Sequence, residues 1–395
     1  MRVVHVNLRL AVAFAALAMA GPAHAAHISA HAMVHTCCTP SAEQERIFSE
    51  AARLHADYIR VDVELNGDLA GLDEVTRLSK RFGLPVLGIL VTPPDFTDAR
   101  EFGRLAGEAA ARAGPAIRHW EVLNEPDAEF AFRGTPEQYA RMLSAAHDAI
   151  EAREPDDRIV LGGLLNPRET GWLARVLDTP GADAVHKLDV GALHLRGPVD
   201  LVVNRYREFS VWLRGRGFRG PVWVTEHGYS ADPAFQNDPA HAGGEEQQAA
   251  YLTESLVGLG EAGAPEVFVT LRDNPDLLPV NAMEGIVGRP AFAAVRRVAD
   301  DWDRLQALRT EQRENELQAL AALIGARASA TRARAARERR RQVEGTGPRA
   351  RAFDAGCEVA AVWHTLAARA QRRHAHAYAS EAALLKREIA WKPGG

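Results

Sequence analysis

The chain has 395 residues, of which 47% are hydrophobic and 25% are charged, a composition typical of a globular protein with a large core. The formal net charge is −5 and the isoelectric point is near 6.3, so no overall positive charge would attract nucleic acid or an anionic membrane. We therefore expect no nucleic-acid partner.

The first 25 residues have the pattern of a secretory signal peptide. Arg2 and Arg9 precede an apolar stretch from Leu10 to Ala20, and Ala23-His24-Ala25 provides small residues for cleavage after Ala25. The apolar stretch is too short to span a bilayer, and no later segment reaches that length without charges. The sequence therefore predicts an exported protein, secreted or periplasmic, without an integral membrane segment after cleavage.

Eight short apolar segments, each ending in polar residues, glycine or proline, predict eight β-strands. Helical patterns lie between them, such as Ser41 to His55 and Thr135 to Arg153, which both begin with helix start signals. Eight alternations of strand and helix predict a (β/α)₈ barrel over residues 26–300, because that fold typically has about 250 residues. The predicted strands cover Ile28–His35, Tyr58–Leu65, Pro85–Thr92, Arg118–Asn124, Arg158–Leu165, Leu188–Leu195, Pro221–Glu226 and Glu266–Leu271.

A doubly wound sheet is the competing fold. It would place a glycine-rich phosphate-binding turn after the first strand, where this chain has His35-Thr-Cys-Cys-Thr39. The barrel is therefore preferred. Because the loops after the strands build the functional site of a barrel, residues at the carboxyl ends of strands are the candidates for function.

The three cysteines, Cys37, Cys38 and Cys357, form an odd number, so in an oxidising compartment at least one is free or pairs with another molecule. A bridge from Cys37 or Cys38 to Cys357 would tie the end of the chain to the barrel, while small buried or reactive side chains are the simpler interpretation. Three histidines, four residues apart between positions 27 and 35, would share a metal only on a helix, and this segment is an expected strand. We expect neither a metal nor a cofactor.

Beyond residue 300 the pattern becomes helical. Apolar residues recur at helical spacing on both sides of Gly345-Thr-Gly-Pro348, which predicts a charged helical hairpin over residues 301–395. Seven arginines lie between Arg327 and Arg341. A solvated helix face is the favoured interpretation, and contact with an anionic envelope polymer is the alternative.

Two glutamates stand where expected strands become loops. Glu125 lies in Asn124-Glu125-Pro126 after the fourth strand, and Glu226 ends the seventh. Cleavage of a glycosidic bond needs a proton for the leaving oxygen and a second carboxylate that attacks the anomeric carbon or activates water. The alternative is a purely structural role for both residues, with Glu125 as an exposed acid in a turn and Glu226 as a helix cap.

The two motifs resemble the clan of retaining (β/α)₈ glycoside hydrolases, nearest the β-xylosidase-like and bacterial exopolysaccharide hydrolase branch. The matching residues are Trp120-Glu-Val-Leu-Asn-Glu-Pro126 and Thr225-Glu-His-Gly228, and the resemblance covers roughly residues 27 to 298. It implies that Glu125 is the acid/base, that Glu226 is the nucleophile and that Asn124 binds the 2-hydroxyl of the sugar. The eighth strand departs from the family, because it ends in Phe268-Val-Thr-Leu-Arg-Asp273 without the usual aromatic residue.

Three further residues join the expected substrate-binding set. Arg60 is placed beside Glu226, where its charge would lower the pKa of that carboxyl, with an internal ion pair to Asp62 as the alternative. His194 ends the sixth strand, where the clan commonly has a substrate-contacting residue, and a satisfied core histidine is its alternative. Tyr229 follows the nucleophile and is expected to stack on a sugar ring, with ordinary loop packing as the alternative.

The sequence thus predicts an exported retaining glycoside hydrolase that cleaves a β-linked oligosaccharide or polysaccharide. The alternative is a catalytically silent carbohydrate-binding or cell-envelope interaction protein on the same barrel, attached through the arginine-rich segment. Both glutamates favour catalysis, and the missing aromatic residue of the eighth strand favours the alternative.

Overall fold

The computed structural model describes residues 27–301, apart from 67, 168–169, 237 and 276–278, together with 311, 314–315 and 318–319. The expected signal peptide, the arginine run, Cys357 and nearly all of the expected hairpin lie outside the described residues. No helix in the described part of the chain has the length and apolar character needed to cross a membrane.

Eight parallel strands form one sheet in the order β5-β4-β3-β2-β1-β8-β7-β6, so the first and last strands of the chain are neighbours. Bridges from Val160 to Val190 and from Leu164 to Leu193 connect β5 to β6 and nearly close the sheet into a barrel. The expected (β/α)₈ fold is confirmed, and the doubly wound sheet is excluded. The strands are β1 (His27–His35), β2 (Ile59–Glu64), β3 (Val86–Val91), β4 (Ile117–Val122), β5 (Arg158–Leu161), β6 (Gly191–Leu195), β7 (Val222–His227) and β8 (Glu266–Thr270).

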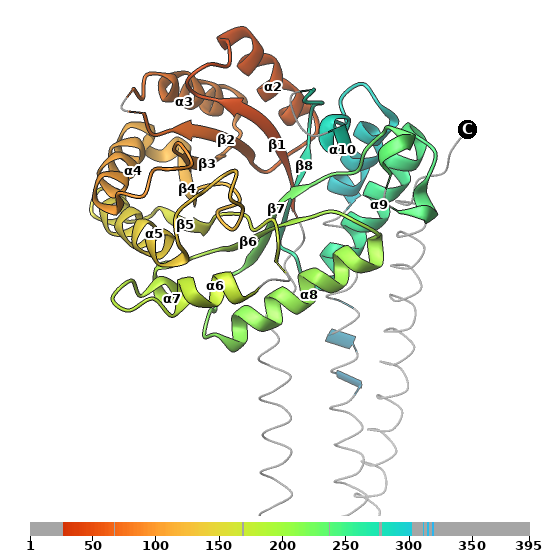
Figure 1. The fold of residues 1–395 in the computed structure, drawn as a ribbon. Helices are drawn as coiled ribbons and strands as arrows, with labels where there is room; N and C mark the ends of the chain where they lie inside the picture. Colours follow the sequence, from red (N-terminus) through yellow and green to blue (C-terminus); the bar gives the residue numbers. More distant parts are fainter. Residues whose placement is uncertain are drawn as a thin grey trace, which may run out of the picture. The chain divides into compact units, whose positions relative to one another are not determined.

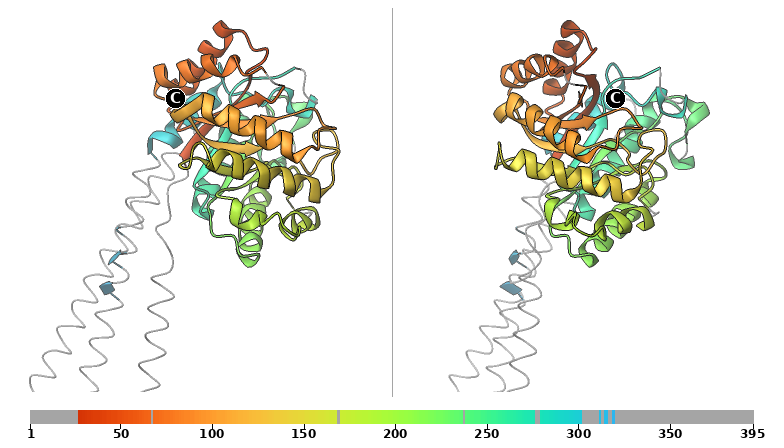
Figure 2. Two further views of the ribbon diagram at one scale, coloured as in Figure 1. Left: turned by 90° about the vertical axis from the view of Figure 1, so that its left-hand side faces the viewer. Right: turned by 60° about the vertical axis from the view of Figure 1, so that its left-hand side comes forward.

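Helices lie outside the strands and cover the barrel (Figures 1 and 2). Both faces of each strand are therefore buried, which explains why segments such as β3 read as continuous apolar runs. The helices are α2 (Ser41–Arg53), α3 (Gly71–Phe82), α4 (Ala99–Ala113), α5 (Pro136–Glu151), α6 (Thr170–Leu177), α7 (Ala184–Lys187), α8 (Val199–Gly215), α9 (Glu245–Ala262) and α10 (Pro279–Ala282), and residues 290–301 are also helical.

Local signals set the ends of several helices. Asp98 caps α4 by accepting hydrogen bonds from two backbone amides, and Thr135 forms a reciprocal capping box with Gln138 at the start of α5. Gly83 ends α3 in the left-handed conformation that glycine adopts without steric cost. These caps set where α3 ends and where α4 and α5 begin, and so fix the lengths of the connections to the neighbouring strands.

The amino-terminal half of the barrel interior is filled by aromatic rings. His119 lies 4.9 Å from Trp223 between ring centroids, Tyr58 lies 5.5 Å from Trp223, and Phe268 completes the cluster at 6.0 Å from the same ring. This packing blocks the barrel below the strand ends. Polar chemistry is therefore confined to the carboxyl ends of the strands.

Glu266 is a buried carboxyl at the start of β8, where Ser29 Oγ donates a 2.6 Å hydrogen bond to it. Burial raises its pKa from 4.5 to about 8. The folded protein therefore keeps a proton that the unfolded chain releases, and the free energy of unfolding should fall as the pH rises from about 4.5 to about 8.

We expect Glu266→Gln to remove this slope, because glutamine carries no proton to lose. The variant should match the wild type near pH 4.5 and be more stable by on the order of a few kcal/mol at pH 8. Urea denaturation across this pH range measures the difference. Parallel curves for the two proteins would contradict the assignment.

Candidate active site

The two glutamates lie together at the carboxyl ends of β4 and β7. Both are more than nine-tenths buried, at 8% exposure for Glu125 and 7% for Glu226. One carboxylate oxygen of each and a ring nitrogen of His194 all lie within 4.8 Å of one another. This proximity fits the separation of about 5–5.5 Å between carboxyl groups that act on one sugar as nucleophile and acid, and not the wider spacing of about 6.5–9.5 Å that admits a water between them.

The backbone around Glu125 is unusual. Leu123 and Glu125 have φ angles of 61° and 45°, in the left-handed region that residues other than glycine rarely occupy. The Glu125 amide donates to the carbonyl of Gly163 on the neighbouring segment at 3.2 Å, which holds the turn in place. Such strain persists where the surrounding structure enforces it, and here it positions the Glu125 side chain.

Glu226 is surrounded by cationic groups. Arg60 Nη1 donates to its Oε1 at 2.7 Å, and Arg196 Nη2 donates to its Oε2 at 3.2 Å. Burial alone would raise the pKa of Glu226, but the imidazoles of His194 and His31 and the guanidinium groups of Arg60 and Arg196 outweigh it and hold the pKa well below its usual range. Glu226 is therefore an anion across the physiological pH range, as expected from Arg60 at the sequence level.

Arg60 is the centre of a fully buried network. It donates from Nε and Nη2 to both oxygens of Glu121, at 2.7 and 2.9 Å, and Nη2 also donates to Asn124 Oδ1 at 2.7 Å. The Gly163 amide donates to Glu121 as well, at 2.8 Å. Because its side chain is buried, Arg60 orients Glu226 and Asn124 from inside the barrel instead of lining the substrate site as the sequence suggested.

Glu121 was missed at the sequence level, although it stands four residues before Glu125 in the same motif. Its position on β4 puts it directly inside the barrel, at zero exposure. A buried acid needs a partner, and Arg60, at 1% exposure, is the one buried arginine among the residues that the structure describes. The alternative considered for Arg60, an ion pair with Asp62, does not form: Arg60 pairs with Glu121, and Asp62 lies 3.2 Å from His35.

His194 is not a satisfied core histidine. Its Nδ1 lies 2.7 Å from Glu125 Oε1 and 3.6 Å from Glu226 Oε2, so it lies between the two acids. Its Nε2 is buried without a hydrogen-bond partner. A side chain at Gly163 would place its Cβ 2.1 Å from that nitrogen, so the glycine is required for the ring to fit. The structure thus brings His194 to the position that the sequence predicted.

His31 on β1 reaches the same cluster. Its Nδ1 is 3.1 Å from Arg60 Nη1, and its Nε2 is 3.6 Å from Glu226 Oε1. Burial lowers the pKa of His31 to about 3, so the ring is neutral at physiological pH. The permanent positive charge beside Glu226 therefore comes from Arg60 and Arg196.

The half-buried Arg196 and the buried Glu284 form a second pair that sequence reasoning missed. Arg196 donates from Nε and Nη2 to the two oxygens of Glu284, at 2.7 and 2.8 Å, and the hydroxyl of Thr270 also contacts Glu284 at 3.4 Å. Arg196 stands two residues after His194, so alternation along the β6 direction could have placed both on one face. Nothing in the sequence linked Glu284 to either of them.

Tyr229 lies elsewhere. Its ring stacks on Tyr251 with a centroid distance of 4.0 Å, and its hydroxyl donates to the carbonyl of Asp238 at 3.1 Å. The side chain is buried in the packing between β7 and α9. We therefore correct the expectation that it stacks on a sugar.

The cluster of Glu125, His194 and Glu226 has the spacing of a three-ligand metal site. Arg60 and Arg196 already neutralise Glu226 through short hydrogen bonds. A cation would have to displace or approach these guanidinium groups, which is electrostatically unfavourable. We therefore interpret the cluster as acid–base machinery and assign no metal to it.

The barrel resembles solved structures of glycoside hydrolases. A glucosidase from Croceicoccus marinus superimposes with a TM-score of 0.55 at 15% sequence identity, over 70% of this chain and 68% of that chain. An exo-β-1,4-mannosidase from Opitutaceae bacterium strain TAV5 gives 0.52 at 17% identity, over 70% and 60%. A β-glucuronidase from an uncultured Clostridium species gives 0.50 at 14% identity, over 71% and 50%.

This chain thus spans between half and about two thirds of the length of these three proteins. At such low identity the likeness shows the (β/α)₈ fold. No family model matches the sequence, and no curated protein matches it.

Proposed function

We propose that the protein is a retaining glycoside hydrolase that cleaves β-glycosidic bonds of an oligosaccharide or polysaccharide without a cofactor. The observation that carries the proposal is the pairing of Glu125 with Glu226, two buried carboxyl groups within 4.8 Å, of which only Glu226 is bound by arginines. A permanent anion beside a carboxyl that is hydrogen-bonded to His194 supplies a nucleophile and an acid in one site.

In the first step the Glu226 carboxylate attacks the anomeric carbon as the bond to the leaving oxygen breaks, and Glu125 gives its proton to that oxygen. In the second step Glu125 takes a proton from water, which attacks the same carbon and releases Glu226. Arg60 fixes the Asn124 amide by donating to Oδ1, so the amide nitrogen of Asn124 is the group presented to a sugar hydroxyl.

The resemblance of the strand-four and strand-seven motifs supports the β-xylosidase-like and bacterial exopolysaccharide hydrolase branch. The amino-terminal pattern supports export with cleavage after Ala25, and we keep the division into residues 1–25, 26–300 and 301–395 as part of the proposal. Contact of Arg327 to Arg341 with an anionic envelope polymer is tested by co-sedimentation, which rising salt should abolish.

The proposal is tested by incubating the purified mature protein with aryl β-glycosides and bacterial exopolysaccharides. We expect new reducing ends from at least one of them, and the first product seen by NMR should have the β configuration. Release of the α anomer would overturn the retaining mechanism. Absence of turnover on every substrate of the panel would overturn the proposal that the protein is a hydrolase.

A second candidate is a catalytically silent carbohydrate-binding protein, and the end of β8 favours it. Leu271 is buried there, and Arg272 is bound by Glu43 and Glu50, so no aromatic ring provides the usual floor for a sugar at this strand. Binding of a polysaccharide without any release of reducing ends would support this candidate.

Arg196 provides a prediction specific to this chain. We expect Arg196→Met to raise the pKa of Glu226, because one of its two permanent positive neighbours is lost. Since Glu226 must be an anion to attack, the acid limb of the kcat/KM profile should move to higher pH by roughly one unit.

Arg104→Met is the matched control, because Arg104 is exposed on α4 and pairs only with residues of its own helix. The control should leave the pH profile unchanged. A uniform loss of activity in Arg196→Met, with the acid limb in place, would show that Arg196 has only a structural role.

A further inference from the structure

The loop of residues 36–40, between β1 and α2, carries a disulfide between the adjacent Cys37 and Cys38. The loop follows the carboxyl end of β1, the strand whose His31 contacts Glu226. It therefore belongs to the same rim as the two glutamates. The bridge from either cysteine to Cys357, considered at the sequence level, is not formed.

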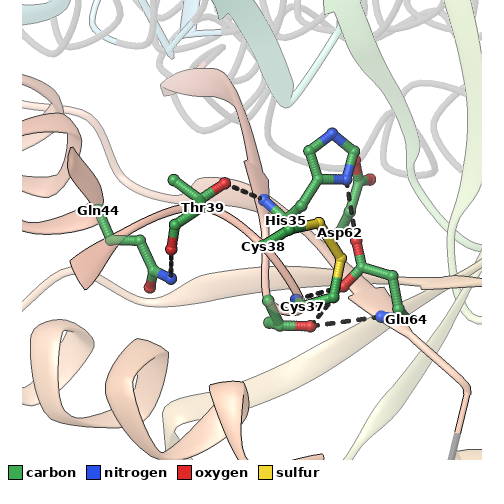
Figure 3. Close-up of a disulfide and its surroundings, with 8 residues drawn as sticks. His35, Cys37, Cys38, Thr39, Gln44, Asp62 and Glu64 are labelled. Atoms are coloured by element: carbon green, nitrogen blue, oxygen red, sulfur yellow. Dashed lines mark hydrogen bonds and ion pairs between the residues drawn. A yellow bond between two sulfur atoms is a disulfide. The ribbon is translucent and has the colours of Figure 1, made fainter.

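Hydrogen bonds hold this loop in one conformation (Figure 3). Glu64 at the end of β2 accepts from the Cys37 amide at 3.0 Å and from Thr36 Oγ1 at 2.6 Å. On the other side, the His35 amide donates to Thr39 Oγ1 at 2.9 Å. A loop fixed in this way presents the disulfide as a preorganised surface.

Stabilisation of the fold does not explain the disulfide. Cross-links stabilise proteins mainly by closing long loops in the unfolded chain, and a bridge between adjacent residues closes the shortest loop possible. Both cysteines are exposed, so their sulfurs fill no core either. We therefore look for the role of the two cysteines at the protein surface that they form.

That surface borders two cavities on the rim. One of about 640 Å³ is lined by Cys38 with Met33, His35 and Asn274, and one of about 300 Å³ is lined by His35, Asp62 and Glu64 with Leu65, Val91 and Pro93. His35 belongs to both. The disulfide thus stands beside an exposed imidazole and the half-buried carboxylates of Asp62 and Glu64.

We propose that the Cys37–Cys38 disulfide is the apolar floor of a second sugar subsite, which binds a further pyranose ring of the substrate beyond the ring held between Glu125 and Glu226. Sulfur is polarisable and a disulfide has no donor hydrogen, so its face suits the C–H face of a pyranose. His35 and Asp62 at its edge offer hydrogen-bond partners for the ring hydroxyls.

This inference rests on the proposed function, and it addresses the missing aromatic residue at the end of β8. The end of β8 lacks the aromatic ring that would hold a sugar, and the disulfide supplies an apolar surface in the loop after the neighbouring strand β1. A site extended along the rim in this way favours oligosaccharides over single glycosides.

The test compares Cys37→Ser/Cys38→Ser with the wild type on two substrates. These are the shortest aryl β-glycoside that the wild type hydrolyses and its homologue with one more β-linked sugar. On the shorter substrate we expect kcat/KM within about twofold of the wild type. On the longer one we expect a loss of about tenfold, carried by KM, since loss of a stacking contact costs roughly 1.4 kcal/mol. Equal effects on both substrates would overturn the subsite.

Cys357→Ser is the matched control, because it removes the remaining cysteine and leaves the disulfide intact. It should behave as the wild type and show no free thiol under denaturing conditions, and two free thiols would overturn the disulfide. Reduction of this variant should reproduce the loss on the longer substrate, and reoxidation should restore it, without any mutation that affects folding.

If no glycoside is hydrolysed, the proposed function fails and the subsite is measured by binding. Calorimetry with β-linked oligosaccharides should then show weaker binding to Cys37→Ser/Cys38→Ser than to Cys357→Ser. Equal affinities, or no binding by either protein, would overturn the subsite independently of catalysis.

Discussion

Glu226→Gln is expected to lower kcat/KM by on the order of 10⁴-fold or more, because the glycosyl-enzyme intermediate cannot form without the nucleophile. Glutamine keeps one oxygen that can accept from one of the two arginines, and Arg60 and Arg196 remain paired with Glu121 and Glu284, so the fold should persist. Activity assays with an aryl β-glycoside and thermal unfolding of the variant measure both effects.

Two further results identify Glu226 as the nucleophile. A 2-fluoro glycoside should label the wild type at this residue, as seen by peptide mass spectrometry. Azide added to Glu226→Ala should attack the substrate directly and give the α-glycosyl azide, with inversion. Glu129→Gln is the control, because Glu129 is exposed in the loop after Glu125 and should leave activity unchanged. Labelling at another residue would contradict the assignment.

Glu125→Gln is expected to slow substrates with poor leaving groups by on the order of 10²–10⁴-fold. Activated aryl glycosides should lose far less in the first step, because their leaving groups depart without a proton. A plot of the rate against the pKa of the leaving phenol measures this difference. Equal losses on all substrates would show that Glu125 is not the acid.

Azide distinguishes Glu125 from Glu226 in a second way. In Glu125→Ala the covalent intermediate still forms on Glu226, and azide attacks it without needing a general base. The product should be the β-glycosyl azide, with retention, which is the opposite anomer to that expected from Glu226→Ala. The α anomer from Glu125→Ala would reverse the two assignments.

The sequence by itself determined the barrel and the place of the two glutamates. Parallel strands covered by helices are apolar on both faces, so each strand stands out as a short run, and the residues that end it must lie on one rim. Glu125 and Glu226 followed from their positions at strand ends, whereas the places of His194 and Arg60 in the site were implied by the family resemblance.

Only the tertiary structure decided the partners. Arg60 pairs with Glu121 instead of Asp62, because the barrel brings β2 and β4 to face each other across its interior, which no local spacing reveals. The same holds for Arg196 and Glu284, which are 88 positions apart. The expected sugar contact of Tyr229 was wrong because its ring stacks on Tyr251, which is distant in the sequence. The ends of strands depend on the local pattern of apolar and polar residues, so they could be predicted from the sequence. Contacts between residues that are distant in the sequence depend on how the strands assemble into the barrel, so they could not.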